Sequence, residues 1–213
     1  MKITILTAML VLIPAAAFAQ KWEFGADGGV GLLNNVSVTG AQGTNAAATA
    51  GFAPGFSAGA FVAENLYAHF SGEIRYEYME SNLRLTTGGQ SAQFSGYSQA
   101  VHYDVVYHTR AEGPVHFFGA LGGGLKTFAG TGAEAAYQPL SQYGYFTKTT
   151  TAKPMLSAAA GVTFRLSPKL SLRGEIRDFA SAFPAKVLTP PSGVKYGSPL
   201  NEIVPMVSIV YSK

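Results

Sequence analysis

The sequence predicts an all-β protein, an eight-stranded antiparallel up-and-down transmembrane β-barrel. Three observations lead to this fold class: an N-terminal export signal, eight runs in which apolar and polar residues alternate, and connections that are alternately long and short. Composition agrees, because 47% of the 213 residues are hydrophobic and only 13% are charged, which excludes a disordered chain. The absence of cysteine excludes disulfides, thiolate metal sites and a cysteine nucleophile.

The first 19 residues have the organisation of a secretory signal peptide. Lys2 gives a positive start, residues 3–13 form an apolar core, and Ala17 and Ala19 form the small-residue pattern of a cleavage site. The apolar core is too short for a membrane anchor. We therefore expect residues 1–19 to be removed and residues 20–213 to form one outer-membrane β-barrel domain.

Eight runs of about ten or more residues follow, and a tilted strand crosses a bilayer in about 9–11 residues. In chain order they cover residues 21–32, 51–62, 66–79, 94–108, 115–127, 154–166, 170–179 and 202–212. The third run is the most regular, since Ile74 and Tyr76 alternate with Glu73 and Arg75. Such a strand has one apolar and one charged face.

The remaining runs fit the same period with two points to note. In the second run Gly51, Gly55 and Gly59 have the spacing of packed membrane helices, but Pro54 inside the segment favours a strand. In the fifth run Phe118 falls on the polar side. The sixth, seventh and eighth runs alternate regularly, and in the eighth the apolar face ends at Tyr211.

The connections between the runs alternate in length. About 18, 14, 26 and 22 residues separate the runs at one end, whereas residues 63–65, 109–114 and 167–169 connect them at the other. Alternating long loops and tight turns are typical of transmembrane β-barrels. The long loops are the segments that we expect to carry any surface interaction.

Strand parity assigns each charged side chain to a face of the barrel. An ionised group on the lipid side costs about 2–4 kcal/mol at the bilayer midplane, so the charged face points inward. There, opposite charges compensate one another in a narrow, filled interior. The predicted lumen charge network contains Asp27, Glu73, Arg75, Glu77, Asp104, Lys126, Arg165, Arg173, Glu175 and Arg177. A network that only satisfies the polar interior is the preferred interpretation, and a gated ion path is the alternative.

Aromatic residues near the strand ends predict the interfacial girdles of a membrane barrel. On the short-turn side they are Trp22, Phe24, Tyr107, Phe117, Phe164 and Tyr211. On the long-loop side they are Phe52, Tyr76, Tyr78 and Tyr97.

This organisation resembles the small outer-membrane barrels of the OmpA/OmpX type. The final strand, residues 206–213, is similar to the C-terminal signal that such barrels present to the outer-membrane insertion machinery. It departs from the family because it ends in Lys213, with the aromatic Tyr211 two residues earlier. The resemblance implies a bacterial outer-membrane location, contact with outer-membrane lipids and lipopolysaccharide, and assembly by that machinery.

Two groups of residues are candidates for a chemical site. His69, Ser71 and Glu73 faintly resemble the His-x-Ser motif of outer-membrane lipid A deacylases, but the motif departs from that family at the residue after the serine. Strict alternation also separates their side chains by about 6.6–7 Å, beyond a direct hydrogen bond. His102 and Asp104, with the neighbouring His108, have no diagnostic metal spacing.

The sequence thus predicts a non-catalytic, monomeric outer-membrane barrel with a structural or surface-interaction role. We expect no cofactor, no metal and no nucleic-acid partner, since the net charge of +3 comes from scattered residues. The alternatives are a lipid A-modifying enzyme, a narrow ion pore, and a secreted soluble barrel that binds a small apolar ligand.

Overall fold

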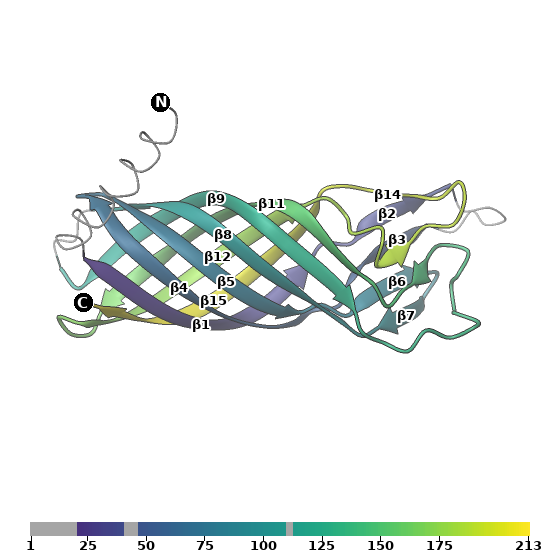
Figure 1. Cartoon of the computed structure of the whole chain (residues 1–213), viewed down its shortest axis with the longest axis horizontal. Coiled ribbons are helices and arrows are strands. Elements are labelled where there is room, and N and C mark those ends of the chain that lie inside the picture. The colour runs from purple at the N-terminus through teal and green to yellow at the C-terminus, as the bar shows by residue number, and fades with distance from the viewer. Residues whose placement is uncertain (1–20, 41–46, 110–112) are drawn as a thin grey trace, which may run out of the picture.

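A computed structural model describes residues 21–40, 47–109 and 113–213, so the expected signal peptide lies outside the described residues. Eight strands close into a barrel in which each strand is antiparallel to both neighbours (Figure 1). Around the barrel they are β1 (Trp22–Leu33), β15 (Leu200–Ser212), β12 (Leu170–Ser181), β11 (Thr150–Arg165), β9 (Val115–Gly130), β8 (Gly96–His108), β5 (Phe70–Glu80) and β4 (Gly55–Tyr67). The predicted fold class is confirmed. Within the described part of the chain, no helix has the length and apolar character needed to cross a bilayer.

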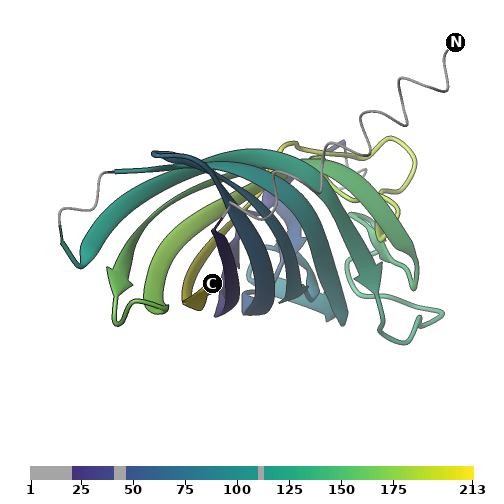
Figure 2. The ribbon, with the colours of Figure 1, turned by 60° about the vertical axis from the view of Figure 1, so that its left-hand side comes forward.

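The barrel closes where the first strand meets the last. β1 pairs with β4 on one side and with β15 on the other. At the end of this seam the Lys213 amide donates to the Trp22 carbonyl across 2.9 Å. Figure 2 shows the tilted strands curving around a common axis, with the C-terminus beside the start of β1.

The two ends of the barrel differ as the connection lengths predict. β1 begins and β15 ends at the same end of the barrel, which we call the short-turn end. There only a few residues connect one strand to the next. One turn differs from the expected place: β4 continues through residues 63–65 to Tyr67, and residues 68–69 make the turn. Glu64 is tolerated in the strand because it lies near its end, opposite Trp22 and Gly72, where water replaces lipid.

The second sequence run is two strands rather than one. Two residues separate the end of β3 (Ala48–Phe52) from the start of β4 at Gly55. Pro54 lies in this break, where its missing N–H removes no ladder hydrogen bond. The prediction that Phe52 belongs to a membrane girdle is therefore wrong, because its side chain is only 3% exposed in an interior core beyond the barrel.

The opposite end, the loop end, carries a folded cap made of residues 34–40, 47–54, 81–95, 131–149 and 182–199. Its largest part is a five-stranded sheet in the order β14 (Lys195–Tyr196), β2 (Val36–Thr39), β3, β6 (Leu83–Thr87) and β7 (Gln90–Phe94). A second small sheet pairs β10 (Tyr145–Phe146) with β13 (Leu188–Thr189). Figure 1 shows these strands extending the long axis of the barrel.

The cap has its own hydrophobic core, which the loop composition did not predict. Phe52 stacks on Phe128 with ring centroids 5.5 Å apart and lies 6.4 Å from Phe183. Leu83, Leu85, Val187 and Leu188 are completely buried in the same cluster. The Tyr196 hydroxyl donates to the Tyr143 carbonyl across 2.9 Å, and burial raises the pKa of Tyr196 above its usual range.

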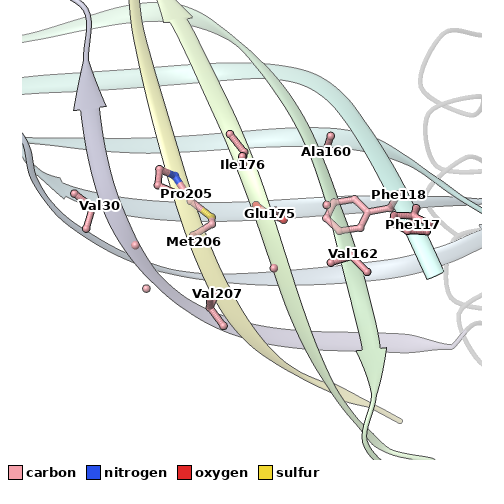
Figure 3. A pocket seen from close by; sticks show the side chains of 14 residues that line it. Val30, Phe117, Phe118, Ala160, Val162, Glu175, Ile176, Pro205, Met206 and Val207 are labelled. Atoms are coloured by element: carbon pink, nitrogen blue, oxygen red, sulfur yellow. The ribbon is translucent and has the colours of Figure 1, made fainter. Parts of the chain in front are cut away.

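The outward side chains of the barrel strands are apolar and exposed. Large exposed residues on this face include Leu121, Leu125, Leu156, Ile176, Phe117 and Ile209. A shallow apolar groove crosses it where Gly28 and Gly174 provide no side chain, between Val30, Ile176 and Val207 (Figure 3). A continuous exposed apolar belt of this kind marks a membrane or protein contact surface.

We expect a cation on this belt to destabilise the barrel in a bilayer. Leu121 lies near the middle of β9 and is 68% exposed, so Leu121→Arg should cost about 2–4 kcal/mol of unfolding free energy. Reversible urea unfolding in phospholipid vesicles measures this loss. Tyr137→Arg, at an exposed position of the cap, is the control and should change the value by less than about 0.5 kcal/mol. Equal losses for both variants would contradict a lipid-facing belt.

Candidate functional site

The interior of the barrel is organised around Arg75 on β5. Its guanidinium lies 2.7 Å from Asp27, 2.9 Å from Glu73 and 3.1 Å from Glu77, and a fourth carboxylate, Glu175, is 3.5 Å away. The Arg75 side chain has no exposed surface. Alternation of β5 directs Glu73, Arg75 and Glu77 inward, while β1 and β12 supply the other two acids.

Two arginines of β12 extend this group toward both ends of the barrel. Arg173 contacts Glu73 at 2.6 Å and Glu175 at 2.7 Å. Arg177 contacts Glu175 at 3.0 Å and also forms a short ion pair with Asp104 of β8. Each guanidinium is therefore shared by at least two carboxylates. Sharing offsets the large desolvation cost that an isolated buried charge would carry.

A further ion pair lies closer to the loop end, between Lys126 of β9 and Glu202 of β15. Lys126 is also 5.3 Å from the centroids of Phe128 and Phe179, a distance at which a cation interacts with an aromatic ring. Glu202 is absent from the predicted network, although its parity with Val204 and Met206, opposite Ile203, is a signal that could have placed it inside. We call the predicted residues other than Arg165, together with Glu202, the interior network.

Arg165 does not join these residues. It has the inward parity that the sequence assigns to it, but it is the last residue of β11 and its side chain is exposed at the short-turn end. None of the ion pairs among the described residues includes it. At that position water solvates the guanidinium, so no partner is needed.

Apolar side chains cover the interior network on both sides. Toward the loop end lies a cluster that includes Met79, Met155 and Phe179. Toward the short-turn end, the Arg173 guanidinium stacks over Phe118 at 3.9 Å, and Arg75 lies 4.3 Å from the ring centroid of Phe61. Phe118, which breaks the sequence pattern of its strand, is therefore an inward residue that packs against the planar face of an arginine.

Ser71, the candidate nucleophile, pairs with His108 and not with the His69 that the sequence motif suggests. Ser71 Oγ lies 2.7 Å from His108 Nε2, whereas His69 Nδ1 lies 3.0 Å from the His108 carbonyl oxygen. Ser71 is 3% exposed, and His108 Nδ1 has no hydrogen-bond partner among the described residues. Glu73 is committed to the arginines of the interior network. Among the described residues, therefore, no acid orients His108, and the serine itself is buried.

In the candidate metal site, His108 lies apart from His102 and Asp104. His102 Nδ1 lies 3.0 Å from Asp104 Oδ1 inside the barrel, while His108 contacts Ser71. Across the described ranges, no group of three or more His, Cys, Asp or Glu side chains is arranged to hold a metal ion.

The predicted girdle aromatics other than Phe52 are outward or partly exposed. The ring of Tyr78 stacks with that of Tyr97, with centroids 5.7 Å apart, and its centroid lies 5.8 Å from that of Phe56. Phe56 is not among the predicted girdle residues. At the short-turn end the same face carries Trp22, Phe24, Tyr107, Phe117, Phe164 and Tyr211. Tyr76 lies on the outer face of β5, paired with Ala60 and Val101.

These features define a small closed eight-stranded barrel with an apolar exterior, a charged and filled interior, and a cap at one end. The chain has the fold of the small eight-stranded outer-membrane barrels. It is similar to Neisserial surface protein A (NspA), with a TM-score of 0.54 and 11% identity over 88% of this chain and 96% of that one. It is also similar to the outer membrane protein OprG from Pseudomonas aeruginosa, with a TM-score of 0.55 and 11% identity over 91% and 95% of the two chains. No family model and no curated protein matches the sequence.

Proposed function

We propose that the protein is a non-catalytic outer-membrane barrel of a Gram-negative bacterium that anchors its cap at the cell surface as an interaction module. The observation that carries this proposal is the cap itself. Its strands and its core hold the long connections in one arrangement, as a rigid scaffold does for binding loops. A pre-organised surface loses little conformational entropy when a partner binds.

The barrel serves as an anchor rather than as a conduit. Arg75, Glu77 and Arg177 are fully buried in its centre, and apolar clusters lie on both sides of them. These side chains therefore have no contact with bulk water. We expect no conductance above background in planar bilayers, and a conductance that changes with Arg177→Gln would overturn this part of the proposal.

The exposed apolar belt favours the membrane over a soluble barrel. In the outer membrane this belt would contact lipids and the acyl chains of lipopolysaccharide, and the stacked aromatics at the loop end would lie at the interface. Assembly would depend on the outer-membrane insertion machinery. The barrel has no unpaired edge among the eight strands, which is consistent with a monomer.

Single-cysteine labelling tests the orientation, because the natural chain has no cysteine. Tyr137 in the cap is 82% exposed and Tyr67 at the short-turn end is 79% exposed, so they form a matched pair. In intact cells, a maleimide attached to a large polymer should label Tyr137→Cys and leave Tyr67→Cys unlabelled. Permeabilising the outer membrane should make the two labelling yields equal.

Labelling of Tyr67→Cys alone in intact cells would reverse the orientation, and recovery of both variants in the soluble fraction would refute the membrane location. A shift in gel mobility between unboiled and boiled protein is the accompanying check that each variant has folded as a barrel.

A further inference from the structure

Unpartnered oxygen atoms gather on one wall of the barrel interior, around Asp27. Asp27 Oδ1, Glu77 Oε2, Ser57 Oγ and Ser208 Oγ are all buried and without a hydrogen-bond partner among the described residues. Buried polar atoms in native proteins are nearly always satisfied, so a group of orphaned atoms indicates an unseen water or ion. Ser57 is only 2% exposed and Ser208 only 1%.

The four residues lie on four consecutive strands of the barrel, β15, β1, β4 and β5. Asp27 of β1 is directly paired with Ser208 of β15 on one side and with Gly59 of β4 on the other. Glu77 Oε2 occupies the space above Gly59, since it lies 2.5 Å from where a Cβ would be. Arg75 Nη1 donates to one oxygen of each carboxyl group, Asp27 at 2.7 Å and Glu77 at 3.1 Å, so the two groups lie side by side and would share a proton if no ion lay between them. The residue paired with Asp27 on the other side, Ser208, adds a buried hydroxyl next to these two groups.

Ser57 approaches the same place from β4. It is paired with Gly29, the next inward position after Asp27 on β1. Its Oγ lies 3.0 Å from where the Cβ of Gly29 would be, so the hydroxyl lies over β1, one inward position along the strand from Asp27. The absence of side chains at Gly29 and Gly59 provides the room that the oxygens use.

The charges of the interior network do not balance. It contains the carboxylates of Asp27, Glu73, Glu77, Asp104, Glu175 and Glu202 against the cations of Arg75, Lys126, Arg173 and Arg177. Asp27 and Glu77 each contact only one cation, and it is the same nitrogen, Arg75 Nη1. The excess negative charge thus falls on the two acids whose remaining oxygens have no partner. Uncompensated charge at such depth is strongly unfavourable.

We propose that the barrel interior binds a calcium-like divalent cation between Asp27 and Glu77, with the hydroxyls of Ser57 and Ser208 as further ligands. The ligand set consists entirely of oxygen, which hard cations prefer, and calcium accepts irregular geometry at about 2.3–2.6 Å. Because calcium takes about six to eight oxygen ligands, enclosed water molecules would complete the four that the protein provides. One divalent ion supplies the two positive charges that the interior network lacks. The Arg75 guanidinium holds the opposite oxygen of each carboxylate and so fixes the direction of both. The site depends on the closed barrel alone and not on the role of the cap.

The test is metal content and stability of the full chain. Because the ligands are buried, the ion enters as the barrel closes, so the protein is refolded in detergent either with calcium chloride or with EDTA and then dialysed. We expect about one calcium per chain after refolding with calcium, and a higher unfolding midpoint than after refolding with EDTA. Magnesium chloride and sodium chloride serve as parallel probes of selectivity.

Three variants separate the site from general effects. Glu77→Gln and Ser208→Ala should lose the bound calcium and the difference between the two refolding conditions. Glu80→Gln, an outer carboxylate hydrogen-bonded to Asn82 rather than to the interior network, should retain both. Ser208→Ala removes no charge, so it remains informative if Glu77→Gln fails to fold. Wild-type protein that contains no metal and has the same midpoint with EDTA would overturn the proposal and assign the missing charge to protons on the carboxyl pair.

Discussion

Arg75→Met should reduce the free energy of unfolding by about 3–5 kcal/mol, the largest single effect that we expect in the barrel. Methionine retains much of the side-chain length but leaves the carboxylates of Asp27, Glu73, Glu77 and Glu175 without their shared cation. Removing one partner from a buried network is far more costly than removing an exposed charge, because the remaining charges cannot reach water.

Urea unfolding in detergent, followed by the fluorescence of the single tryptophan, Trp22, measures this effect. Arg165→Met is the matched control, since Arg165 is exposed, and it should shift the free energy by less than about 0.5 kcal/mol. Adding Glu77→Gln to Arg75→Met should recover part of the loss. If both single variants unfold at the wild-type urea concentration, the ion pairs contribute nothing to stability.

Phe52→Ala should destabilise the cap by about 3–5 kcal/mol, the cost of removing a buried phenylalanine, while the barrel remains closed. Phe52 is 3% exposed and packs against both Phe128 and Phe183, so its removal opens a cavity between the cap sheet and the rest of the core. Local opening then exposes the cap segments without unfolding the strands below.

Limited proteolysis of the protein in detergent distinguishes the two regions. Phe52→Ala should be cut within the cap at least tenfold faster than wild type, while the heat-dependent gel shift of the barrel persists. Tyr137→Ala, which removes an exposed aromatic from the same cap, should be cut at the wild-type rate. Wild-type resistance in Phe52→Ala would mean that this core does not hold the cap together.

The barrel strands could be predicted because their information is local. A residue such as Glu175 shows its face through its two neighbours, and that parity is repeated over ten or more positions. The cap strands contain two to five residues, and their pairings, such as Lys195 with Thr39, join distant segments. Alternation over so few residues carries little signal, and the sequence pattern therefore predicts the wrong surface for Phe52.

Alternation along a strand predicts which residues point into the barrel, but it does not predict which of them contact one another. The sequence indicates that Ser71 and Glu73 share a face, but the height of each residue in the barrel depends on strand register. That register brings His108 of β8 to Ser71, while His69 lies in the turn. Glu202 shows the same limit, because its partner Lys126 lies on a strand that is not its neighbour.

The pairing of β1 with β15 also determines when the barrel can close during synthesis. β15 is synthesised after every other barrel strand, and it is the hydrogen-bonding partner of both β1 and β12. A nascent chain that lacks it has two open edges, and open edges promote pairing with other chains. The barrel therefore cannot close until β15 has been made, and closure joins the first barrel strand of the chain to the last.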